Sequence, residues 1–105
     1  MQFSAECLSC ESSYRVTGIA CGPDRLSVDW VDEGGTGHLE AGTADGVTYA
    51  GHYGYPQLDD HRRVRFTLFR SAAGELLFVG RWWNTADGGG GEWAFRLTPQ
   101  PAVQA

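Results

Sequence analysis

The chain has 105 residues, of which 42% are hydrophobic and 20% are charged, and its formal net charge at pH 7 is −5. A chain of this length can bury one core of its own, so we expect a single domain over residues 1–105. The negative charge disfavours nucleic acid and anionic membranes as partners. No apolar run approaches the ~18 residues of a membrane-spanning helix. The first six residues lack the basic start and apolar stretch of a secretory signal, so we expect a cytoplasmic protein.

The N-terminal segment, residues 1–13, carries the motif Cys7-Leu8-Ser9-Cys10, and Cys21 precedes Asp24 by three residues. This spacing resembles a zinc ribbon, in which two Cys-x-x-Cys pairs flank a hairpin, with Asp24 in the place of the fourth thiolate. A zinc site formed by Cys7, Cys10, Cys21 and Asp24 is therefore one interpretation. The interpretation that we favour has no cofactor, and treats the cysteines as thiols buried like small apolar groups. Three cysteines cannot all pair within one chain, so we predict no disulfide framework.

Alternation of apolar and polar residues dominates the remainder of the chain. It is clearest over residues 26–30, 47–55, 63–68 and 92–97. Short segments rich in Gly, Asp and Pro separate these runs and predict tight turns, which join antiparallel neighbours. The sequence therefore predicts an all-β fold, an antiparallel meander of about seven strands that forms a small closed or partly open β-barrel.

Three segments do not share this pattern. Residues 56–62 form a longer polar stretch, and residues 88–91 are four consecutive glycines. We expect both to be mobile connections. The tail over residues 99–105 contains two prolines and little to bury, so we expect it to fray.

Large aromatic side chains occupy the apolar face of the predicted strands, so they should point into one interior. A barrel of seven or eight strands is either just filled by its side chains or wide enough for one small ligand. Rings with hydroxyl and indole N–H groups suit apolar or sugar-like ligands. We therefore predict a non-enzymatic module that binds a small ligand in an aromatic-lined interior. The predicted ligand-binding residues are Trp30, Tyr49, Tyr53, Phe66, Trp82 and Trp93.

The tripeptide Gly80-Arg81-Trp82 resembles the Gly-x-Trp element of lipocalin and avidin-like barrels. In lipocalins the element lies on the first strand, whereas here it lies late in the chain. The resemblance implies a meander barrel with a ligand at its mouth. Three residues are too few to carry over a substrate or a set of binding residues.

The segment over residues 76–83 is apolar on both faces of its strand. If Phe78 and Trp82 point inward, then Leu77, Val79 and Trp83 point outward and require cover. We predict that these three residues form a homodimer interface. The alternative function is a structural or protein-interaction domain with a filled core, which would homodimerise or dock a protein partner on the same strand.

Overall fold

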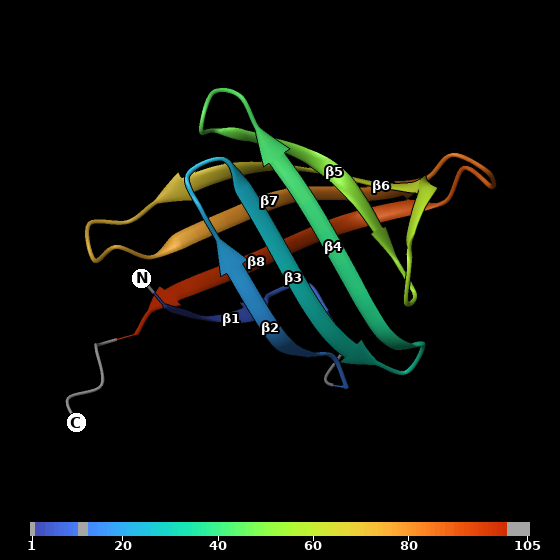
Figure 1. Cartoon of the computed structure of the whole chain (residues 1–105), viewed down its shortest axis with the longest axis horizontal. Coiled ribbons are helices and arrows are strands. Elements are labelled where there is room, and N and C mark those ends of the chain that lie inside the picture. Colours follow the sequence, from blue (N-terminus) through green and yellow to red (C-terminus); the bar gives the residue numbers. More distant parts are fainter. Residues whose placement is uncertain (1, 11–12, 101–105) are drawn as a thin grey trace.

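The computed structural model describes residues 2–10 and 13–100, and within these ranges the fold is all-β (Figure 1). Eight antiparallel strands form one sheet in the order β1-β8-β7-β6-β5-β4-β3-β2. None of the described residues belongs to a helix long and apolar enough to cross a membrane. The strands are β1 (Phe3–Cys7), β2 (Arg15–Cys21), β3 (Arg25–Asp32), β4 (Gly35–Thr43), β5 (Thr48–Gly54), β6 (Leu58–Arg70), β7 (Leu76–Asn84) and β8 (Gly90–Pro99).

The sheet curls into a nearly closed barrel. Each strand from β2 to β7 pairs with the next along the chain, and β8 also pairs with β1. The strands β1 and β2 then lie next to each other at a seam that no ladder of described residues closes. The predicted antiparallel meander is thus confirmed. The strand absent from the sequence-based prediction is β1, which lies within the N-terminal segment 1–13.

Side chains from alternate positions of every strand meet in one interior, as the two-residue period requires. The largest of the fully buried side chains are Trp30, Tyr49, Phe66, Phe78 and Phe95. Aromatic pairs connect them, including Tyr49 with Phe78, whose ring centroids are 5.1 Å apart. Gly37 faces Trp30 across the β3–β4 ladder, where any Cβ would overlap the indole. The interior position predicted for the aromatic rings is therefore correct for Trp30, Tyr49, Tyr53, Phe66 and Trp93, whereas Tyr55 is exposed.

Glycine also permits the tight curvature of the wall. A Cβ on Gly80 in β7 would overlap the backbone of Arg65 and Phe66 in β6, and a Cβ on Gly51 would overlap β4. These are points of close backbone approach, a role that glycine serves in curved sheets. The glycine of the Gly80-Arg81-Trp82 element thus has a direct structural purpose.

The structure shortens both predicted connections, because the second part of each belongs to a strand. Leu58–Arg62 forms the first part of β6, where Leu58 pairs with Gly54 and Arg62 with Asn84. Gly90 and Gly91 belong to β8 and pair with β7. Backbone ladders need no particular side chain, so polar and glycine-rich residues continue a strand whose neighbour is already in place. Of the predicted fraying tail, Pro99 ends β8 and the Gln100 amide donates to the Gln2 carbonyl, whereas residues 101–105 lie outside the described ranges.

Candidate functional site

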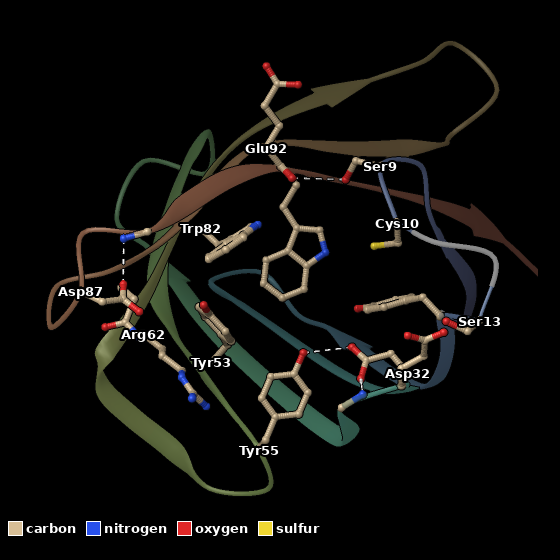
Figure 2. Close-up of a pocket in the computed structure, with 16 residues that line it drawn as sticks. Ser9, Cys10, Ser13, Asp32, Tyr53, Tyr55, Arg62, Trp82, Asp87 and Glu92 are labelled. Carbon is tan, nitrogen blue, oxygen red and sulfur yellow. Dashed lines mark hydrogen bonds between the residues drawn. The ribbon is translucent and has the colours of Figure 1, made fainter.

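A cavity of about 590 Å³ opens at one end of the barrel. The end of β5, the start of β8 and the segment that precedes β2 all contribute to its wall. Figure 2 shows Trp82, Tyr53 and Tyr55 on one side of it and Cys10, Ser13 and Asp32 on the other. Five aromatic side chains line the cavity, namely Tyr14, Tyr53, Tyr55, Trp82 and Trp93.

The aromatic wall is held by packing between its own rings. Tyr53 contacts Trp93 edge to face with centroids 5.4 Å apart, and it contacts Trp82 in the same manner at 6.2 Å. Below them Trp30 is fully buried, and its ring lies 5.2 Å from that of Trp93. Because an edge-to-face contact restricts the motion of both rings, the wall has its shape before any ligand binds.

Asp32 anchors the opposite side of the cavity through three hydrogen bonds. Its Oδ2 accepts from Trp30 Nε1 at 3.1 Å and from the Tyr55 hydroxyl at 3.0 Å. Its Oδ1 accepts from the Gly34 amide at 2.8 Å. A carboxylate with three donors is fixed in position, so negative charge is built into the wall.

Two polar atoms of the wall are buried without a hydrogen-bond partner among the described residues. They are the indole Nε1 of Trp93 and the hydroxyl of Tyr14. Trp93 is only 6% exposed. A buried N–H without an acceptor costs about 1–3 kcal/mol, which a molecule that supplies the acceptor would recover.

The electrostatic surroundings of the cavity favour protonated phenols. Burial raises the pKa of the Tyr14 hydroxyl above its ordinary value, and nearby Tyr55 and the Asp32 carboxylate act in the same direction. Burial likewise raises the pKa values of Tyr53 and Tyr55. All three hydroxyls therefore stay neutral at physiological pH and can donate or accept hydrogen bonds.

The charged residues of the lining are mostly acidic. Among its described residues, four are acidic, namely Asp32, Glu33, Asp87 and Glu92, and one is basic, namely Arg62. None of these four carboxylates takes part in an ion pair with another described residue. Arg62 already has two partners, since its Nε lies 3.9 Å from an Asp59 carboxylate oxygen and its guanidinium lies over the ring of Tyr55 in the lining.

The structure divides the predicted ligand-binding residues into two groups. Tyr53, Trp82 and Trp93 line the cavity, and Trp30 lies directly beneath it. Tyr49 and Phe66 lie deeper, packed against Phe78 within the core.

Sequence reasoning did not include Tyr14, Tyr55 and Asp32 in the site. Tyr55 shares the alternation of Tyr53, so its pattern was a usable signal. Tyr14 and Asp32 lie at strand boundaries, where the alternation of apolar and polar residues predicts no direction for a side chain.

The cysteines differ from their predicted state. Cys7 and Cys10 form a disulfide, where we expected thiols, because the turn after β1 brings their Cα atoms to 5.6 Å, within the range that a disulfide spans. Cys10 lines the cavity, whereas Cys21 is a free thiol that ends β2, the strand that runs away from the cavity. The four predicted zinc ligands are thus not gathered, and residues 2–10 and 13–100 hold no cluster of three or more metal-ligating side chains. Zinc binding stays a prediction.

The predicted interface residues lie on the outer face of β7. Val79 is 40% exposed, Leu77 and Trp83 are partly exposed, and the Arg81 guanidinium lies 5.0 Å from the centroid of a Trp83 ring. Leu77 also lines a shallow hollow of about 330 Å³ together with Leu8 and Phe69. The outer apolar surface is therefore wider than the three predicted residues.

Comparison with known proteins assigns no family to this chain: no protein-family model, no curated protein and no solved structure matches it.

Proposed function

We propose that this protein is a non-enzymatic β-barrel module that binds one small organic ligand, apolar or sugar-like, in the aromatic-lined cavity at the open end. The observation that carries the proposal is the Trp93 indole N–H, which is buried in the cavity wall without an acceptor. A ligand oxygen at this point would satisfy the donor, while the rings of Tyr53 and Trp82 provide stacking surface.

The volume and construction of the cavity support the same proposal. About 590 Å³ lies within the range of small-molecule sites, and the wall combines apolar rings with a few fixed polar groups. The hydrogen bonds from Trp30 and Tyr55 to Asp32 hold the wall in place before any ligand arrives. Binding therefore requires little ordering of the protein.

Titration with the neutral fluorescent probe N-phenyl-1-naphthylamine tests this function. We expect a saturable fluorescence increase with one site per chain, because the probe is apolar and of suitable size. Tyr53→Ala should weaken binding by about tenfold, since it removes one wall ring. The control Val79→Ala alters the outer face and should bind like the wild type. Absence of saturable binding to the folded wild type would refute the proposal.

A second candidate function is homodimerisation through the outer face of β7, and the exposed apolar surface around Val79 favours it. Phe69, which is 55% exposed, and Leu8, which is 49% exposed, extend that surface. Burial of such side chains on two copies yields several kcal/mol at about 25 cal/mol per Å², part of which association entropy offsets. We therefore propose a weak isologous dimer.

Light scattering at high micromolar concentration tests the dimer. The double variant Val79→Glu with Trp83→Glu should be a folded monomer, because it places charge in the contact and leaves inward Phe78 and Trp82 unchanged. The matched control, Ala20→Glu with Ala50→Glu, adds the same charge at exposed positions on β2 and β5 and should dimerise like the wild type. A monomeric wild type would remove this candidate.

A further inference from the structure

We infer that the ligand of the cavity is a small organic cation, an ammonium group that also carries a hydroxyl or carbonyl oxygen. This inference rests on the proposed function and specifies its ligand class. Two independent features of the cavity carry it: the lining carboxylates, which form no ion pair with another described residue, and the Trp93 N–H, which has no acceptor among the described residues.

The excess of acidic over basic residues in the lining favours a ligand with a positive charge. Among the described residues of the lining, four carry carboxylates and one, Arg62, carries a guanidinium, which already has Asp59 as a partner. In Figure 2 the Glu92 carboxylate points away from the rings, whereas Asp32 faces them. Because Asp32 is held by Trp30, Tyr55 and Gly34, its charge stays beside the cavity. An anionic ligand would be repelled, and a cation would find a counter-charge without rearrangement.

The aromatic wall favours an organic cation over a metal ion. Faces of Trp and Tyr rings attract ammonium groups through their quadrupoles, and most strongly where water is excluded. Tyr53 and Trp82 lie on the side of the cavity that faces Asp32 (Figure 2), whereas the nearby Tyr55 ring already has the Arg62 guanidinium over it. A methylated ammonium has apolar methyl groups for these rings and charge for the carboxylate, whereas a bare metal ion requires several oxygen ligands.

The Trp93 N–H adds a second requirement, since an indole nitrogen donates and never accepts. Its partner on the ligand must therefore be an acceptor, such as a hydroxyl or carbonyl oxygen. The Tyr14 hydroxyl is a second buried polar atom of the wall without a hydrogen-bond partner among the described residues. One ligand oxygen between them could accept from Trp93 and pair with Tyr14. The ligand class is thus an amino alcohol or amino carbonyl compound with a cationic nitrogen.

Choline and its neutral isostere 3,3-dimethylbutan-1-ol provide the decisive pair of probes, because they share shape and hydroxyl and differ in charge. Calorimetric titration of the full chain should show choline binding about tenfold more tightly than the alcohol. Added sodium chloride should reduce the difference. In a ¹H–¹⁵N spectrum choline should shift the indole N–H resonance that Trp93→Phe removes.

Charge variants locate the effect. Glu33→Gln removes one carboxylate of the lining and should weaken choline about threefold, with no change for the neutral alcohol. Its matched control is Asp24→Asn, which removes one charge from the β2–β3 turn at the other end of the barrel and should leave both affinities unchanged. Asp32→Asn should have a larger effect than Glu33→Gln, and its thermal unfolding curve establishes that it folds.

The outcomes separate this inference from the function on which it rests. Equal binding of choline and the alcohol, or tighter binding of phenyl β-D-glucoside than of choline, would overturn the cation and retain the cavity as a ligand site. Saturable binding of N-phenyl-1-naphthylamine without any choline binding would likewise overturn the cationic ligand class and retain the cavity as a ligand site. If none of these probes binds the folded wild type, both the ligand class and the proposed function are wrong.

Discussion

The two ends of the barrel are built on the same alternating strands but differ in what their inward residues carry. Toward the filled end, inward positions hold mostly Leu, Val and Phe, as at Leu26, Phe78 and Leu97, which are almost completely buried. Toward the open end they hold Tyr53, Trp82 and Trp93, each with a polar atom at its tip. The comparison shows that apolar alternation alone does not distinguish a packed core from a ligand cavity. The unpartnered polar atoms of the wall do, because the Trp93 indole N–H and the Tyr14 hydroxyl are buried there without a partner among the described residues.

The largest expected effect tests whether the interior packs as described. Phe66→Ala and Trp93→Ala should each lower the free energy of unfolding by ~3–5 kcal/mol, because both rings are buried by several neighbours. Trp82→Ala, at the half-buried rim of the cavity, should cost only about 1–2 kcal/mol. Urea denaturation measures all three. Losses below ~1 kcal/mol for Phe66→Ala would mean that the strand register is shifted by one residue.

A smaller effect is expected where the wall between the two ends bends most tightly. Gly80→Ala should destabilise by about 1–3 kcal/mol, since its Cβ would overlap the β6 backbone. The matched control is Gly22→Ala, in the turn between β2 and β3, where a Cβ meets no atom within 4 Å. That variant should stay within about 0.5 kcal/mol of the wild type in the same denaturation assay. Similar losses for both glycines would show that the overlap is relieved elsewhere.

The sequence was sufficient for the fold because a two-residue period leaves few alternatives. Leu26, Val28 and Trp30 must share one face of a strand, and the short turns require antiparallel neighbours. The two-residue period does not reveal segments that lack alternation and become strands only because a neighbouring strand offers them backbone partners. Residues 59–62 are polar on both faces, yet Leu58–Arg62 pairs with the end of β5 and with β7. Similarly, Phe3–Cys7 becomes a strand because β8 offers it an edge.

The candidate site was predictable only in part, for a related reason. Alternation marks Tyr53, Trp82 and Trp93 as inward, but it does not say at which level of the barrel each ring lies. The same alternation therefore marks Tyr49 and Phe66 as inward, although these two rings lie in the packed core and not at the cavity. Level depends on strand stagger, which follows from pairing along all eight strands rather than from any one segment.

The smallest expected effect concerns the outer wall, where His38 of β4 lies between two carboxylates. Its Nδ1 is 2.6 Å from Asp29 Oδ1, and its Nε2 is 3.2 Å from Glu40 Oε1. Partial burial lowers the pKa of His38, but the hydrogen bonds and charges of Asp29 and Glu40 outweigh it, so the pKa is raised overall. Because the folded state holds this proton more tightly than the unfolded state, the contribution is complete below the unfolded pKa of about 6.5. It is lost as pH rises through the higher folded value.

For these half-exposed groups we expect no more than about 0.5 kcal/mol. The measurement is the free energy of unfolding at pH 5.5 and at pH 9, for the wild type and for His38→Gln. The difference between the two proteins should shrink at the higher pH and should be smaller in 1 M salt, because the interaction is between charges. His38 belongs to the wall and not to the cavity, so choline affinity in His38→Gln should equal that of the wild type at both pH values. A difference in stability that grows with pH would mean that His38 is neutral in the folded protein and that the two carboxylates do not hold its proton.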